Sequence, residues 1–196
     1  MRLFIGIALP DEAQEALLLV RARFSSEDGG LRWQEPASWH VTLQFLGSAS
    51  DEQAACAGEK LRAVRAARVP VRVEGLGFFE RAGVFWAGVA LTPELLALQQ
   101  AVVAATRGCG FAAEERAYRP HITLARAKGR GGARALGSLR EAVDNAHAAC
   151  EPRADKDWAL GGWVRAAFVA EEFVLYESVP GPEGSRYEPR GSFALG

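Results

Sequence analysis

The sequence predicts an α+β fold, in which strands and helices share one core without alternating regularly. Short apolar runs typical of strands are joined in some places by helical segments and in others by tight turns, which argues against regular βαβ winding. The 196 residues are 49% hydrophobic and 24% charged, the balance of a globular chain with enough apolar surface for a core. No Pro- or Ser-rich linker divides the chain, so we expect residues 1–196 to form a single domain.

The first half of the chain is expected to hold both helices and strands. Alternating apolar residues predict strands, and apolar residues three and four apart predict helices. In chain order we expect a strand over Leu3–Leu9, a helix over Asp11–Phe24, a strand over Trp39–Leu46, a helix over Ser50–Ala67, strands over Val69–Phe79 and Gly83–Leu91, and a helix over Thr92–Gly108. Asp11 and Ser50 are residue types that cap helix N-termini, and Pro93 suits a first helical position.

The second half repeats elements of the first. We expect a strand over Tyr118–Ala127, a Gly-rich loop over 128–132, a helix over Ala135–Ala149, an irregular connection over Pro152–Gly162, a strand over Trp163–Tyr176 and a last strand over Arg186–Leu195. The strand that begins at Trp163 is expected to bend at Glu171 and Glu172.

Bulk properties favour a cytoplasmic protein. No apolar stretch reaches the roughly 18 residues of a membrane span, and the apolar start is too short for a signal sequence. Cys56, Cys109 and Cys150 are widely spaced and odd in number, so they match neither a disulfide framework nor a CxxC metal site. The net charge is −1. We therefore expect a monomer in a reducing compartment, without a membrane or an obligate protein partner.

One four-residue pattern occurs twice in the chain. Residues 40–43 read His-Val-Thr-Leu and residues 121–124 read His-Ile-Thr-Leu, and these pairs use two of the three histidines and two of the four threonines. In a strand, residues two apart share a face. His40 and Thr42 should therefore project together, as should His121 and Thr123. His147 stands in an Ala-rich helical segment without such a neighbour and is interpreted as structural.

A pair of His-Thr strands suits acid–base chemistry on a phosphoryl group. Imidazole titrates near neutrality, so one histidine can accept a proton while the other donates one. Threonine hydroxyls can donate hydrogen bonds to phosphoryl oxygens as negative charge grows there. A zinc site is disfavoured because the histidines have no neighbouring carboxylate or cysteine ligand, so neither a metal nor a cofactor is expected. A Cys–His nucleophilic site stays open, although no pattern links a cysteine to either strand.

Charge near the second motif indicates an anionic ligand. Residues 116–140 contain seven cations and no acid, and Arg126 and Arg130 are the candidates for phosphate contact. Arg126 follows His121 by five residues, so it faces the cleft only if the strand ends or bulges there. A solvated basic loop is the alternative. Trp33, Phe45 and Trp86 could stack on a base, and Phe45 is the candidate beside the first motif, although aromatic residues in apolar strands more often lie in a core.

The paired motifs, about 80 residues apart, resemble those of the 2H phosphoesterase superfamily, and more narrowly of the RNA 2′,3′-cyclic phosphodiesterases first described as 2′–5′ RNA ligases. The stretches that carry the resemblance are 2–10, 31–33, 39–47, 84–89, 118–126 and 174–178. It implies a bilobal, pseudo-twofold α+β fold with two antiparallel sheets lining a central cleft and helices outside. The segment 128–162 matches poorly.

The resemblance also implies an activity and residue roles. The reaction would be metal-independent hydrolysis of an RNA 2′,3′-cyclic phosphate end to a 2′-phosphate, with His40 as proton donor and His121 as proton acceptor. Thr42 and Thr123 would bind phosphoryl oxygens, with Arg126 as a helper. ATP-independent 2′–5′ ligation would be the reverse of the same chemistry. Two alternatives stay open: a 2H enzyme acting on a small cyclic nucleotide, and a non-catalytic RNA-binding module.

Overall fold

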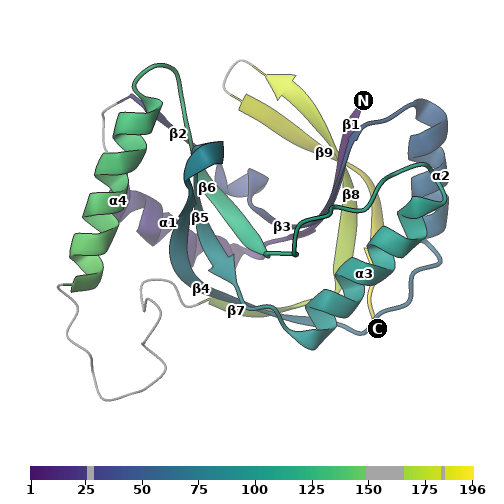
Figure 1. The fold of residues 1–196 in the computed structure, drawn as a ribbon. Helices are drawn as coiled ribbons and strands as arrows, with labels where there is room; N and C mark the ends of the chain where they lie inside the picture. Colours follow the sequence, from purple (N-terminus) through teal and green to yellow (C-terminus); the bar gives the residue numbers. More distant parts are fainter. Residues whose placement is uncertain (26–28, 149–165, 182–183) are drawn as a thin grey trace.

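Two antiparallel sheets form the centre of the computed structural model, which describes residues 1–25, 29–148, 166–181 and 184–196 (Figure 1). The four-stranded sheet has the order β3-β1-β8-β9. Its strands are β1 (Arg2–Ala8), β3 (His40–Ser48), β8 (Glu172–Gly181) and β9 (Gly184–Ala194). The first motif strand, β3, is therefore at the edge of this sheet.

The five-stranded sheet has the order β2-β6-β5-β4-β7. Its strands are β2 (Leu31–Trp33), β4 (Val69–Phe79), β5 (Val84–Val89), β6 (His121–Ala127) and β7 (Ala166–Ala170). The second motif strand, β6, lies inside this sheet between β2 and β5. Each sheet thus carries one His-Thr motif, and the predicted α+β class with two antiparallel sheets is confirmed.

The helices lie on the outer sides of the sheets (Figure 1). They are α1 (Asp11–Phe24), α2 (Asp51–Leu61), α3 (Pro93–Arg107) and α4 (Gly132–Ala148), with short 3₁₀ turns at Pro36–Ser38 and Glu80–Ala82. Helices α1 and α4 contact the five-stranded sheet, α2 contacts β9, and α3 contacts both β3 and β4. Apolar side chains between helices and sheets are buried in one core, which leaves the opposite sheet faces for the cleft. Within the described ranges, no helix is long and apolar enough to cross a membrane.

Several predicted boundaries need correction. Helix α2 ends at Leu61 rather than Ala67, because tight i→i+3 bonds close its last turn and Val64 then packs against the core. Asp11 is the first residue of α1 and does not cap it, since Pro10 is the N-cap and no side chain bonds there. Ser50, in contrast, caps α2 as predicted, in a reciprocal capping box with Gln53.

The strand predicted over Trp163–Tyr176 is two strands in different sheets. β7 pairs with β4, whereas β8 pairs with β1, and the chain crosses between the sheets at Glu171. Strand β2 was not predicted, because three residues are too few to show an alternating pattern. The strand expected from Tyr118 begins at His121. The connection predicted over 152–162, with residues 149 and 163–165, lies outside the described residues.

A disulfide joins Cys56 of α2 to Cys109, just after α3, with 5.8 Å between their Cα atoms. The expectation of no disulfide is therefore wrong. The two cysteines are 53 residues apart in sequence, but α2 and α3 pack against each other and bring them together. The Gln53 side chain also donates to the Cys109 carbonyl at 3.3 Å, so α2 holds the end of α3 at two points.

Candidate active site

Strands β3 and β6 carry the same β-bulge at the same place in the motif. In β3, Leu43 is an extra residue, because Thr42 pairs with Gly6 and Gln44 with Ile5. In β6, Leu124 is the extra residue, because Thr123 pairs with Trp86 and the next residue with Phe85. Both strands accordingly bury two consecutive residues directly after the threonine. A bulge shifts the alternation of faces by one residue.

The bulges decide which later side chains reach the cleft. Gln44 turns inward, where the Thr106 hydroxyl donates to its side-chain oxygen at 2.8 Å. Phe45 turns outward and is 65% exposed, whereas regular alternation along β3 would have buried it with Val41 and Leu43. In β6 the same shift places Arg126 on the face of His121 and Thr123. The sequence predicted that Arg126 would reach this face only if the strand ended or bulged, and the bulge at Leu124 meets that condition.

Both histidines are oriented by equivalent hydrogen bonds, each to the backbone carbonyl of the residue two positions earlier. His40 Nδ1 lies 2.8 Å from the Ser38 carbonyl, and His121 Nδ1 lies 2.8 Å from the Arg119 carbonyl. A carbonyl oxygen only accepts, so each Nδ1 carries the proton. This arrangement leaves Nε2 of each ring as the nitrogen that can exchange a proton with a ligand.

The surroundings of the two rings favour the neutral form. Burial, together with the positive charges of His121 and Arg126, lowers the pKa of His40 from its ordinary 6.5 to about 4, against the opposing hydrogen bond to Ser38. The pKa of His121 is also lowered, first by burial and then by Arg126 and Arg119. The charge of Arg126 thus acts on both rings, so the two histidines and Arg126 share one electrostatic site.

The His40 ring is enclosed by aromatic side chains of three strands. Its centroid lies 4.5 Å from Phe4 of β1 and 5.1 Å from Tyr187 of β9, the latter edge-on at 90°. Phe4 stacks in turn on Tyr176 of β8 at 5.0 Å. Gly6, opposite Thr42, has no room for a side chain, since an added Cβ would approach His40 to 3.3 Å and the Val41 carbonyl to 2.9 Å.

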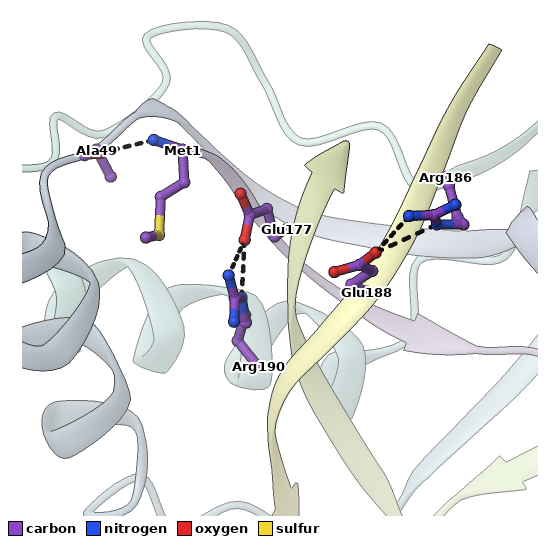
Figure 2. A network of polar contacts seen from close by, with 6 residues as sticks. All are labelled: Met1, Ala49, Glu177, Arg186, Glu188 and Arg190. Carbon is purple, nitrogen blue, oxygen red and sulfur yellow. Dashed lines mark hydrogen bonds and ion pairs between the residues drawn. The ribbon is translucent and has the colours of Figure 1, made fainter. Parts of the chain in front are cut away.

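Two ion pairs lie on the β8–β9 hairpin that carries Tyr187 (Figure 2). Arg190 of β9 donates to the Glu177 carboxylate of β8 from Nε at 2.8 Å and also from Nη2. Arg186 and Glu188, the neighbours of Tyr187, pair with each other at 2.8 Å on the opposite strand face. The Arg190–Glu177 pair therefore ties β9 to β8 near the segment that presents Tyr187 to His40.

The His121 side of the cleft has a different aromatic wall. Phe79 meets the His121 ring edge-on at 4.9 Å, and Trp86 lies 6.3 Å from it. The Trp86 ring lies across Gly77, where an added Cβ would come within 2.3 Å of it. The Arg119 guanidinium covers this pair of rings, 4.9 Å from Trp86 and 5.4 Å from Phe79.

Arg32 is a site residue that the sequence did not reveal. It pairs in register with Arg126, so both side chains leave the same face of the sheet. Its Nε is buried without a hydrogen-bond partner in the described part of the chain. Its guanidinium also lies near Gly184 at the start of β9, since a Cβ added there would be 3.5 Å from Nε. Arg32 could have been found only by predicting strand β2, because the pairing of β2 with β6 is what places Arg32 beside Arg126.

A hollow of about 1060 Å³ adjoins the two motifs. Thr42 and Phe45 of β3 and His121 of β6 line it, and the Tyr118 hydroxyl ties the two sides by donating to the Thr42 carbonyl at 2.9 Å. Arg130 is exposed in the loop after β6 and does not line this hollow. Among the described residues, no group of three or more His, Cys, Asp or Glu side chains could hold a metal ion.

This chain belongs to the LigT-like phosphoesterases of the 2H superfamily. The family model matches residues 7–86, which include the first motif. A relative from Archaeoglobus fulgidus, named RNA 2′,3′-cyclic phosphodiesterase, is 30% identical over 65% of this chain and 73% of its own length. A protein of the same name from Aeropyrum pernix is 36% identical over 57% of this chain, and the match spans 66% of that relative.

Solved structures show the same fold. The crystal structure of Escherichia coli LigT without ligand has a TM-score of 0.73 and 26% identity to this chain, and the alignment covers 99% of this chain and 96% of that one. The similarity therefore extends over both sheets and includes the second motif, which the family model leaves unmatched.

Proposed function

We propose that this protein is a metal-independent RNA 2′,3′-cyclic phosphodiesterase that opens a terminal cyclic phosphate to a 2′-phosphate. The observation that carries the proposal is the matched pair of histidines. Each is held by Nδ1 on a backbone carbonyl, each leaves Nε2 for a ligand, and each shares the field of Arg126. Two imidazoles fixed in this way can serve one in-line displacement at phosphorus.

In the proposed reaction, His121 Nε2 takes a proton from water as the water oxygen bonds to phosphorus. The bond from phosphorus to the 3′ oxygen breaks, and His40 Nε2 gives that oxygen a proton. The products are a 2′-phosphate and a 3′-hydroxyl, and solvent exchange restores both rings. The donor and acceptor assignment comes from the family resemblance, because the two rings have equivalent hydrogen bonds.

His40 must be protonated to act as an acid, although its surroundings in the protein lower its pKa to about 4. A bound phosphodiester anion favours the charged imidazole and raises its pKa. Substrate binding would therefore recruit the proton that catalysis uses. Thr42 and Thr123 would donate to the phosphoryl oxygens, and Arg126 would balance the growing negative charge. Arg130 stays a predicted phosphate contact.

The relatives support a nucleotide substrate. Proteins from Archaeoglobus fulgidus and Aeropyrum pernix carry the name of this activity. Escherichia coli LigT has been crystallised in complex with 3′-AMP and with phosphate. ATP-independent 2′–5′ ligation would follow by reversal, with the 5′-hydroxyl in place of water.

Product analysis tests the proposal. An oligonucleotide ending in a 2′,3′-cyclic phosphate is incubated with the protein in EDTA, and ³¹P NMR distinguishes 2′- from 3′-phosphate. We expect a 2′-phosphate as the product at an undiminished rate. A strict metal requirement, a 3′-phosphate product or no turnover would reject the proposal. Tight RNA binding without turnover would instead favour the non-catalytic RNA-binding module.

A further inference from the structure

The hollow beside the motifs is longer than the reacting phosphate needs. From Thr42 and His121 it extends to three further elements: the outer face of α3, the segment 113–119, and the turn between β4 and β5. Its volume of about 1060 Å³ is slightly above the range of about 300–1000 Å³ for small-molecule pockets. Most of this groove, as we call it from here on, lies away from the histidines.

The charges along the groove are predominantly positive. Five arginines and two glutamates line it: Arg81, Arg107, Arg116, Arg119, Arg140, Glu80 and Glu114. Each glutamate is already paired, Glu114 with Arg116 at 2.8 Å and Glu80 with Arg140. In the part of the chain that the structure describes, the other three arginines have no carboxylate partner. Unpaired cations along one groove favour a ligand with several negative charges.

The groove also offers surfaces that suit bases. Phe45, exposed by the β3 bulge, lines the groove beside the first motif, and Phe79 lines it beside His121, beneath the Arg119 guanidinium. Gln99 and Gln100 of α3 add amide groups that can both donate and accept hydrogen bonds. Aromatic faces interleaved with arginines are typical of single-stranded nucleic acid sites, where bases stack and phosphates pair.

We infer that this groove binds the RNA strand on the 5′ side of the cyclic-phosphate end, with Arg81 and Arg107 contacting backbone phosphates. The inference rests on the proposed function, which places the terminal phosphate between the histidines. It adds the direction of the strand, along α3 and the segment 113–119, and a preference for oligonucleotides over mononucleotides. The β8–β9 hairpin on the other side of His40 would not contact the strand.

The test measures the turnover of two substrates by a groove variant and by a control variant. Arg81→Glu/Arg107→Glu reverses two exposed charges that are outside the catalytic motifs, and Arg62→Glu at the end of α2 is a control outside the groove. The substrates are 2′,3′-cyclic AMP and a six-nucleotide RNA with a cyclic-phosphate end. In the groove variant we expect kcat/KM for the oligonucleotide to fall about tenfold or more and its salt dependence to flatten. In the same variant, kcat/KM for 2′,3′-cyclic AMP should change less than about twofold.

Equal losses on both substrates, or no loss on either, would overturn the inference while leaving the proposed function intact. If the wild-type protein turned over neither substrate, the proposed function would fail instead. In that case, fluorescence anisotropy measures the binding of a hexanucleotide with a 3′-hydroxyl end, which tests RNA binding in the groove independently of catalysis. Salt-sensitive binding that the double variant weakens about tenfold, and Arg62→Glu does not, would support the groove, and unchanged binding would overturn it.

Discussion

Phe45 and Arg126 occupy equivalent positions in the two sheets. Each lies five residues after its histidine, and each reaches the cleft because one leucine bulges out of the strand register two residues earlier. An apolar ring and a guanidinium thus stand at corresponding places in otherwise matched motifs. The pseudo-symmetry of the fold therefore supplies a pair of matched histidines, and under the proposed function Phe45 would contact a base where Arg126 would contact a phosphate.

Arg126→Met should raise the pKa of both His40 and His121, because the positive charge of Arg126 lowers both. It should also raise KM about tenfold through the lost phosphate contact. Histidine titrations by NMR and steady-state kinetics measure the two effects. Arg134→Met, an exposed site in the first turn of α4, is the control. Unshifted histidine titrations in Arg126→Met would contradict the shared electrostatic site.

Thr42→Val and Thr123→Val should each lower kcat/KM about 10- to 100-fold, the cost of a hydrogen bond to a charged oxygen. Valine keeps the shape and the strand preference of threonine, so the fold should remain. Kinetics with a cyclic-phosphate substrate, together with thermal unfolding, separate the two effects. Full activity in either variant would remove that hydroxyl from the site.

The low pKa of His40 predicts a specific loss of stability in acid. Above pH 6.5 the ring is neutral in both folded and unfolded chains. As the pH falls from 6.5 to about 4, the unfolded chain gains a proton on His40 that the folded chain resists, so unfolding becomes easier. At pH 4.5 this term is about 2 kcal/mol.

His40→Asn isolates that term, since an amide can keep the bond to Ser38 but cannot titrate. Urea unfolding of both proteins at pH 7 and pH 4.5 measures it. The decrease in the free energy of unfolding should be about 2 kcal/mol larger for the wild-type protein. Equal decreases would show that the folded protein does not suppress protonation of His40.

The Cys56–Cys109 disulfide should contribute about 2–4 kcal/mol to stability, because it closes a loop of 53 residues in the unfolded chain. Unfolding of the wild-type protein and Cys56→Ser without reductant should differ by that amount, and the difference should vanish with reductant. Thiol titration of the denatured wild-type protein should find one free thiol before reduction and three after. Three thiols before reduction would contradict the pairing.

Local patterns were enough to predict the motif strands and most helices. His40 and His121 could be selected from sequence because a two-residue spacing fixes a shared strand face. The bulges could not be predicted, since the burial of Gln44 depends on Thr106, 62 residues away. Arg32 was missed because β2 is defined only by its pairing with β6. The disulfide likewise depends on the packing of α2 against α3.

The central claim is that His40 and His121 act together on one phosphate. Its most direct test is kcat on a cyclic-phosphate RNA in EDTA for the wild-type protein, His40→Asn, His121→Asn and the double variant. In each single variant kcat should fall by a factor of about 10²–10⁴. The kcat of the double variant should be only slightly lower than that of the less active single variant, because the two groups serve one step. Full activity in either single variant, or losses that multiply in the double variant, would contradict the claim.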